Sequence, residues 1–185
     1  MRHMGLSPSL KLFPPQDMTF QIIPMTPAHI AEAVRVQAQA FPEDLRESPE
    51  VFADRMERFG EYFRVVFMGE RMVGYMISFP WKLGDTPVNN EKFPADLPEP
   101  DCFYIHDIAI LPDARGAGIS RAMLEDAYQT ALRLGFDAVS LVAVGQSGSF
   151  WDNAGFVPYT QVGPRKLERI LDIYGPGARL MALPI

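Results

Sequence analysis

The sequence predicts an α/β fold in a single domain, with a mixed sheet flanked by helices. Two strand-like segments are separated only by Gly69-Glu70, and a two-residue connection with glycine first is typical of a type II′ hairpin. Later, strand-like residues 103–110 are followed by a helical pattern at 118–134 and an apolar run at 138–144. This order predicts one βαβ crossover, so the sheet combines antiparallel and parallel strands. A length of 185 residues suits one domain with a sizeable core.

Strand-like residues 18–24 begin the domain, and two helices follow. Thr26 and Ser48 each precede a proline, and a capping residue before a proline indicates the N-terminus of a helix. The predicted apolar positions are Ile30, Val34, Ala38 and Phe41 in the first helix and Phe52, Met56 and Phe59 in the second, and the predicted hairpin strands are 62–68 and 71–79.

A polar, proline-rich segment at 82–102 is predicted to be a loop, and loops of this length in a compact domain are usually functional or disordered. The helix at 118–134 is predicted to end at Gly135 and to place Ile119, Met123, Ala127, Ala131 and Leu134 on its apolar face. The remaining predicted elements are a short helix at 147–154, a strand at 155–159, a helix from Pro164 that carries Leu167, Ile170, Leu171 and Tyr174, and a strand at 178–185.

The composition narrows the class of partner. The net charge is -6, which argues against nucleic acid as the main partner because phosphate binding needs a basic surface. Cys102 is the only cysteine, so neither an intrachain disulfide nor a thiolate metal cluster is expected, and no metal is predicted. We identify neither a signal peptide nor a membrane span. The sequence therefore predicts a cytoplasmic protein without a membrane partner, with residues 1–17 as an extended arm and 18–185 as the domain.

The turn before the long helix contains the sequence Arg-Gly-Ala-Gly at 115–118. Free backbone N–H groups and the positive end of the helix dipole point the same way at such a turn, which makes it a ready anion site, commonly for diphosphate. Glycine lets the backbone turn tightly and approach the phosphates. The side chain of Arg115 can add a contact to a phosphate.

Two common phosphate-binding motifs do not fit this turn. The P-loop requires a lysine followed by serine or threonine, and this turn has no lysine. The dinucleotide motif requires a third glycine where Arg121 stands and an acidic residue near Ala138. A glycine-containing turn without a ligand stays open as the simpler interpretation.

The stretch DIAILPDARGAGISRAMLEDA, which begins at Asp107, resembles motif A of the GNAT superfamily, the GCN-five-related N-acetyltransferases. That motif follows a strand with R-x-x-G-x-G/A and then a helix. Read from Arg115, the match ends with Ser120 in the small position; read from Asp113, aspartate replaces the arginine. A second motif of the superfamily, Y-x-x-x-G-F, resembles the sequence from Trp151 to Phe156, with tryptophan in place of tyrosine.

The resemblance implies a sheet that is split between the strands at 103–110 and 138–144, with acetyl-CoA in the split. The pantetheine arm would pair with backbone of Ile108, Ala109 and Ile110, and Trp151 would line its tunnel. The pyrophosphate would bind N–H groups of Arg115, Gly116, Ala117, Gly118, Ile119, Ser120 and Arg121. An acceptor amine would then attack the thioester directly in a ternary complex.

This reaction requires a base for the amine proton and a hydrogen-bond donor for the oxyanion, which is expected to be a backbone N–H near Ile110. Asp107 and His106 are the candidate bases, and Tyr104 is a further candidate. Strand alternation predicts that His106 and Asp107 lie on opposite faces of the sheet, with Tyr104 on the face of His106. A structural role for each of these side chains stays open.

Trp151 is the main departure from the superfamily pattern, because an indole cannot protonate the leaving thiolate as a tyrosine hydroxyl can. The sequence therefore leaves two functions open: an acetyl-CoA-dependent N-acetyltransferase that acts on a primary amine, and a GNAT-fold module that binds acyl-CoA without catalysis. Small amines, amino acids, polyamines and peptides all stay open as acceptors, and a homodimer stays open as the assembly.

Overall fold

The computed structural model describes residues 19–145 and 147–185, so the predicted arm at 1–17 and Met18 of the first predicted strand lie outside the described residues. The strands are β1 (Gln21–Pro24), β2 (Arg64–Met68), β3 (Arg71–Trp81), β4 (Cys102–Ile110), β5 (Ala138–Ala143), β6 (Val157–Pro158) and β7 (Arg179–Pro184). The helices are α1 (Ile30–Ala40), α2 (Pro49–Phe59), α3 (Ile119–Leu134), α4 (Gly148–Asn153) and α5 (Pro164–Tyr174), with short 3-10 turns between some of them.

One seven-stranded sheet forms the centre of the molecule, in the order β1-β2-β3-β4-β5-β7-β6. Only β4 and β5 are parallel, and each of the other neighbouring pairs is antiparallel. This order confirms the predicted mixed, largely antiparallel fold. In the described part of the chain, no helix is both long and apolar enough to cross a lipid bilayer.

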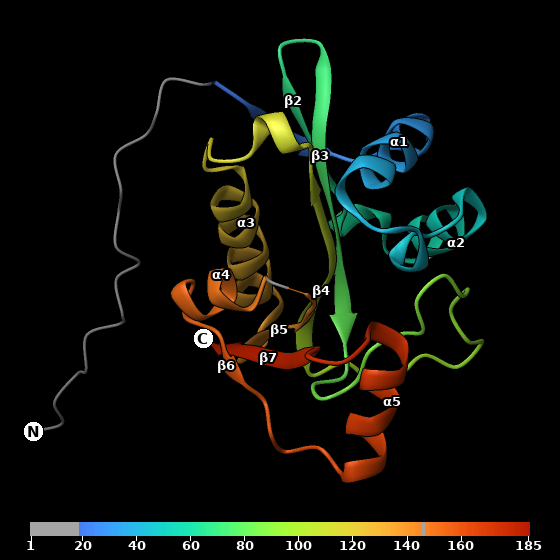
Figure 1. Ribbon diagram of the computed structural model, residues 1–185, viewed down its shortest axis with the longest axis vertical. Coiled ribbons are helices and arrows are strands. Elements are labelled where there is room, and N and C mark those ends of the chain that lie inside the picture. Colours follow the sequence, from blue (N-terminus) through green and yellow to red (C-terminus); the bar gives the residue numbers. More distant parts are fainter. Residues whose placement is uncertain (1–18, 146) are drawn as a thin grey trace, which may run out of the picture.

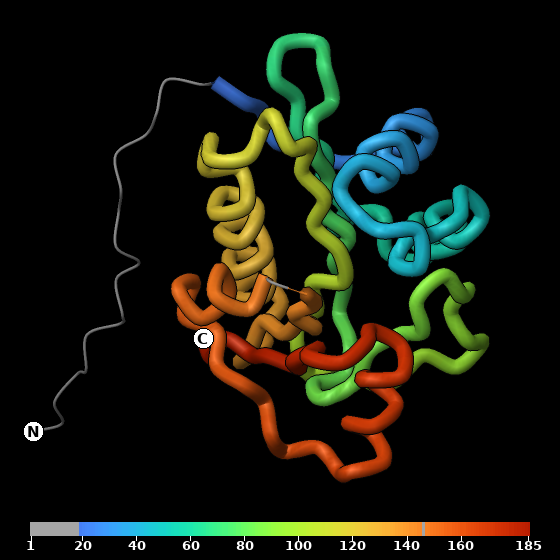
Figure 2. The backbone as a smooth tube through the Cα atoms, viewed as in Figure 1, coloured from blue at the N-terminus to red at the C-terminus, as the bar shows by residue number. Residues whose placement is uncertain are grey.

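Helices cover both faces of the sheet. The pair α1 and α2 lies on one face and α3 lies on the other (Figure 1). The loop at 82–101 runs beside α5 at one end of the sheet, as the green and red segments of the tube show (Figure 2). Thr86 in this loop hydrogen-bonds the Tyr174 hydroxyl at 3.0 Å, and Lys166 in α5 pairs with Asp85 at 3.5 Å. The loop and α5 therefore form one layer at that end.

Two glycine positions confirm the local predictions. Gly69, at the turn between β2 and β3, has a φ of 61°, as the first position of a type II′ turn requires. Gly135 follows α3 with a φ of 76° and donates its N–H to carbonyls of the last turn, which is the predicted C-terminal cap.

Some element boundaries and faces differ from the prediction. The predicted strand at 155–159 forms ladder pairs only at Val157 and Pro158, and β4 already begins at Cys102. Ala38 is exposed, because α1 turns Ala33, Val36 and Gln37 toward the sheet instead. Leu134 is 41% exposed in the last turn of α3.

Candidate functional site

The sheet opens between β4 and β5. The parallel ladder joins only Phe103 to Val139, Tyr104 to Ser140 and Ile105 to Leu141, whereas β4 continues to Ile110 with β3 as its partner. The backbone of Ile108–Ile110 therefore has no strand on its β5 side. This is the split that the resemblance implies, and its open edge can hydrogen-bond an extended ligand.

The glycine turn lies directly after this open edge. Gly116 and Gly118 both have a φ of 84°, and an added Cβ at either position would meet no atom within 4 Å. Gly118 is the N-cap of the 16-residue helix α3, and the first backbone N–H groups of a helix have no partner within the helix itself. The turn is therefore an open cradle with the chemistry that a diphosphate needs.

Two adjoining pockets occupy the split. The first, the loop-side pocket, has a cavity volume of about 190 Å³ and is lined by Ala40, Phe41, Ile108, Ile110, Arg115, Ser120, Ser147, Phe150 and Trp151. Five of these, Ile108, Ile110, Arg115, Ser120 and Trp151, are predicted CoA-binding residues. The other predicted residues, Ala109, Gly116, Ala117, Gly118, Ile119 and Arg121, are not among those that line it.

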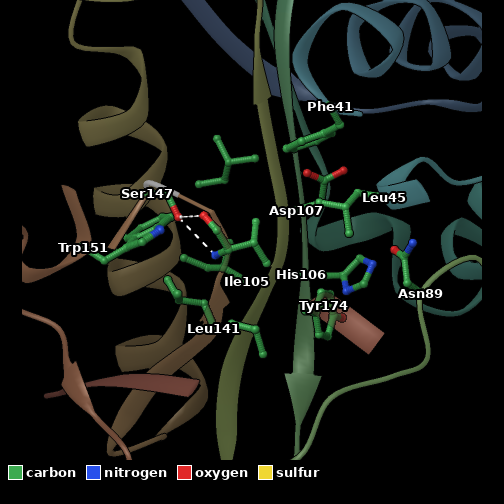
Figure 3. A pocket seen from close by; sticks show the side chains of 13 residues that line it. Phe41, Leu45, Asn89, Ile105, His106, Asp107, Leu141, Ser147, Trp151 and Tyr174 are labelled. Carbon is green, nitrogen blue, oxygen red and sulfur yellow. Dashed lines mark hydrogen bonds between the residues drawn. The ribbon is translucent and has the colours of Figure 1, made fainter. Parts of the chain in front are cut away.

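The second, the central pocket, has a cavity volume of about 130 Å³ and shares Phe41, Ile108, Ser147 and Trp151 with the first. Figure 3 shows its two sides: Trp151, Ser147 and Leu141 lie across β4 from Asp107, His106 and Leu45. Its full lining is Phe41, Leu45, Asn89, Ile105, His106, Asp107, Ile108, Leu141, Val142, Val144, Ser147, Trp151 and Tyr174.

The prediction that His106 and Asp107 lie on opposite faces is wrong. The register of β3 and β4 shifts between Ile77 and Ser78, whose partners are Asp107 and Ile105, so His106 is the extra residue of a β-bulge. A bulge interrupts the alternation of side chains, so the side chains of both residues lie on the face of the sheet that α1 and α2 cover. A bulge can be seen only from the pairing of two strands, so the period of β4 alone could not reveal it.

Asp107 is held by a hydrogen bond from the neighbouring strand. The hydroxyl of Tyr75 in β3 donates to Oδ2 of Asp107 at 2.5 Å. Burial raises the pKa of Asp107 to about 7, although the Tyr75 hydrogen bond lowers it. The nearby carboxylate of Glu47 raises this pKa further, and Arg55 lowers it. Asp107 is therefore a carboxyl group that can take up or release a proton near neutral pH.

His106 belongs to a buried ionic cluster. Its Nε2 lies 3.0 Å from Oε1 of Glu47, and the same oxygen lies 2.7 Å from Nη2 of Arg55. Arg55 and Glu47 have side chains only 1% and 2% exposed. Burial raises the pKa of Glu47, but His106 and Arg55 outweigh burial and lower it overall. Glu47 is therefore ionised and can only accept hydrogen bonds.

The protonation state of His106 follows from its surroundings. Burial lowers the pKa of the imidazole, Arg55 lowers it further, and these two effects exceed the opposing influence of Glu47. His106 is therefore neutral at neutral pH. Because the Glu47 carboxylate is an acceptor only, the ring proton is on Nε2 and Nδ1 carries a lone pair.

The sequence analysis did not identify Glu47 or Arg55. Gln37 fixes Glu47 by two backbone hydrogen bonds, of 2.9 Å from the Glu47 N–H and 2.6 Å to its carbonyl. One signal was present: Arg55 stands in line with Phe52 and Phe59 on the apolar face of α2, at helical spacing. A charged residue in such a stripe indicates a buried charge that needs a partner.

Tyr104 is fully buried and does not line either pocket. Its hydroxyl lies 2.8 Å from Oγ1 of Thr86, which also contacts Tyr174. Burial raises the pKa of Tyr104 well above its ordinary value. The structure thus places this hydroxyl in a cluster that joins β4, the 82–101 loop and α5.

Trp151 lies where both pockets meet. Its ring packs edge-on against Phe150 and Phe156, with centroid separations of 4.8 Å and 5.3 Å. The indole therefore forms part of the wall of both pockets.

Comparison with known proteins gives the family. The family model described as the Acetyltransferase (GNAT) family matches residues 30–156, more than half of the chain. No curated protein sequence matches the chain. In the described residues, no group of three or more His, Cys, Asp or Glu side chains could hold a metal ion.

Solved structures share the fold at low sequence identity. Ribosomal-protein-S18-alanine N-acetyltransferase from Escherichia coli is 20% identical with a TM-score of 0.61, over 90% of this chain and 94% of that one. Arabidopsis thaliana Naa50, in complex with the bisubstrate analogue CoA-Ac-MVNAL, is 14% identical with a TM-score of 0.62, over 88% and 97%. Rv2747 from Mycobacterium tuberculosis, in complex with CoA and NLQ, is 14% identical with a TM-score of 0.63, over 89% and 99%. From the split sheet, the glycine turn and the family match, we conclude that the chain belongs to the GNAT acetyltransferase family.

Proposed function

We propose that the protein transfers an acetyl group from acetyl-CoA to a primary amine, by direct attack in a ternary complex. The observation that carries the proposal is the placement of Asp107. This carboxyl group, with a pKa of about 7, lines a pocket in the split of the sheet, next to the open backbone edge of β4.

The donor would lie along the split. Backbone groups of Ile108–Ile110 would pair with the pantetheine arm, and the cradle from Arg115 to Arg121 would hold the pyrophosphate. Arg115 supports this placement, since its side chain lines the loop-side pocket and its Nε lies 3.4 Å from the carbonyl of Ile110. The guanidinium is therefore kept at the end of β4, between the two binding regions.

The acceptor would enter the central pocket as an ammonium. Asp107 takes one proton from it, directly or through a water molecule, and the neutral amine attacks the thioester carbon. The new C–N bond forms and the C–S bond breaks, and the second proton that the nitrogen must lose passes to the departing CoA sulfur or to solvent, so that the products are the neutral amide and CoA. A free thiol titrates near about 8.5, so this leaving group needs little help from an acid. Trp151 then contributes shape rather than a proton.

Two solved structures with a similar fold support the donor half of this reaction. The Naa50 structure contains an analogue that combines CoA with a peptide, and the Rv2747 structure contains CoA and NLQ. Those ligands belong to those proteins, which are each 14% identical to this chain. They support a CoA donor here and leave the acceptor to be identified.

The decisive experiment combines binding with turnover. Acetyl-CoA and CoA should each raise the melting temperature, because a ligand at about 100 times its Kd adds roughly 2.7 kcal/mol of stability. Release of free thiol from acetyl-CoA in the presence of an amine panel, with the N-acetyl product identified by mass spectrometry, would establish the reaction. Stabilisation by CoA without acetylation of any amine would favour the non-catalytic acyl-CoA-binding module. The replacement of the family tyrosine by Trp151 is the observation that keeps this alternative in view.

A further inference from the structure

The central pocket has a distinct polar end. His106 from β4, Asn89 from the 82–101 loop and Tyr174 from α5 line it, and Figure 3 shows the three side chains close to one another. Most other lining residues are apolar, so this end can discriminate between ligands by hydrogen bonding. Three separate segments of the chain meet here, and none of their polar groups is used in the acetyl transfer described above.

His106 presents an unused acceptor at this end. Its Nδ1 is buried and has no hydrogen-bond partner among the described residues, whereas Nε2 is bound to Glu47. The two ring nitrogens point in different directions, and Glu47 does not line the pocket although His106 does. Nδ1 is therefore the ring nitrogen that is left to bind a ligand of this pocket. A buried polar atom without a partner is uncommon in proteins and calls for an explanation.

Asn89 and Tyr174 define what this end can bind. The Asn89 amide donates only one long hydrogen bond, of 3.4 Å to the carbonyl of Asp44. Within the described residues, nothing donates to its side-chain oxygen. The Tyr174 hydroxyl is already engaged with Thr86 at 3.0 Å. The end therefore offers two acceptors and the second N–H of the Asn89 amide, and no lysine or arginine is among the residues that line this pocket.

Building on the proposed function, we propose that the acceptor carries a second hydrogen-bond donor besides its reacting amine, and that this donor binds to Nδ1 of His106 and the side-chain oxygen of Asn89. A hydroxyl, an amide N–H or a second ammonium has the required chemistry. A carboxylate does not, since it cannot donate to Nδ1 and would bring a second negative charge near the Glu47 carboxylate.

Access to Nδ1 involves Asn89. This side chain lies beside the His106 ring (Figure 3), and its long bond to Asp44 holds it weakly. Because Nδ1 is buried, a donor reaches it only when a neighbouring side chain moves, and this weakly held amide lines the same pocket. His106 itself stays in place, because Glu47 is fixed by Arg55 and by the backbone N–H of Asn90 at 3.1 Å.

The test uses pairs of amines that differ only in the donor: tyramine with 2-phenylethylamine, and 4-aminobutan-1-ol with n-pentylamine. We expect kcat/KM with acetyl-CoA to be at least about 10-fold higher for the donor-bearing member of the better-accepted pair, because an unpaired buried acceptor disfavours the other. Equal kcat/KM values within both pairs would overturn the inference and leave the acetyltransferase function standing. Acetylation of no amine at all, with CoA binding intact, would instead reject the proposed function.

Two variants locate the donor site. His106→Gln can keep an amide N–H for Glu47 but removes the ring nitrogen Nδ1, and its one remaining acceptor is the carbonyl oxygen on the same carbon as that N–H group. Asn89→Leu removes the amide at a partly buried position of the loop. In each variant the ratio of kcat/KM within the pair should fall to about 3-fold or less. Asn153→Leu, at an exposed asparagine that does not line the pocket, is the control and should leave the ratio unchanged. If both His106→Gln and Asn89→Leu keep the kcat/KM ratio of the parent protein within the amine pair, the assignment of the donor site is overturned.

Discussion

The hydroxyl of Tyr75 donates a 2.5 Å hydrogen bond to Oδ2 of Asp107, on the face of the sheet that α1 and α2 cover. The bond favours the ionised carboxylate, but burial disfavours it more strongly, and the pKa of Asp107 is raised to about 7. A general base works best when its pKa lies near the working pH. Tyr75 therefore limits how far burial can raise this pKa.

The first prediction concerns Asp107 as the base. Asp107→Asn should lower kcat by roughly 10²- to 10⁴-fold, the usual contribution of a positioned base. In the parent protein kcat/KM should rise with pH through a pKa near 7, the value for Asp107. Tyr75→Phe removes the hydrogen bond that lowers this pKa, so the rise should move to higher pH. Near-normal turnover by Asp107→Asn would show that another group takes the proton.

The second prediction concerns stability. The folded-state pKa of Asp107 is about 7 and its ordinary value is 3.8, so the native state binds more protons than the unfolded state between these values. The contribution of Asp107 to stability therefore falls as pH rises through this window. The melting temperature of Asp107→Asn relative to the parent should increase between pH 5 and pH 8, as measured by calorimetry. A difference independent of pH would contradict the raised pKa.

The third prediction concerns the buried ion pair. Arg55→Met removes the partner of Glu47 and leaves a buried carboxylate, which should cost about 3–5 kcal/mol of unfolding free energy in a urea titration. Arg58→Met is the matched control on the same helix. Arg58 makes an exposed hydrogen bond to the carbonyl of Pro94, and its loss should cost less than about 1 kcal/mol. Similar losses for the two variants would mean that the Glu47–Arg55 pair is not the stabilising contact.

The fourth prediction concerns the glycine cradle. Gly118→Val should reduce the affinity for CoA at least about 10-fold, because valine strongly disfavours a positive φ and its side chain would project into open space at the cradle. Gly177→Val is a close control: Gly177 has a φ of 90° and equally open surroundings, but lies between α5 and β7. Calorimetric titration with CoA should show weakened binding only in Gly118→Val. Unchanged binding there would reject the anion site.

The fifth prediction concerns Trp151. Trp151→Phe keeps an aromatic wall, so kcat should fall by less than about 10-fold, with the larger effect on the KM for acetyl-CoA. Trp151→Ala should be worse, since it opens a cavity at a cost of about 3–5 kcal/mol. Steady-state kinetics on one good amine would measure both. A loss of several orders of magnitude in kcat for Trp151→Phe, with KM and fold unchanged, would mean that the indole N–H acts in the transition state.

The features that the sequence determined by itself are local ones, which depend only on residues that are close together along the chain. The turn at Gly69, the cradle with Gly116 and Gly118, and the cap at Gly135 were all predicted, because each requires a positive φ that glycine adopts at low cost. The order of strands and helices was also predicted, because the spacing of apolar residues that indicates each element involves only residues close together in the sequence. These features gave the fold class, and the resemblance to the GNAT superfamily implied the location of the split.

Tertiary structure decided the chemistry of the pocket. The bulge at His106 depends on how β4 pairs with β3, and the contact of His106 with Glu47 joins residues that are 59 positions apart. The raised pKa of Asp107 and the neutral state of His106 both arise from burial among groups on α2 and β3. Because burial and long-range charge depend on the whole packed structure, no pattern within β4 could have assigned these two side chains to one pocket.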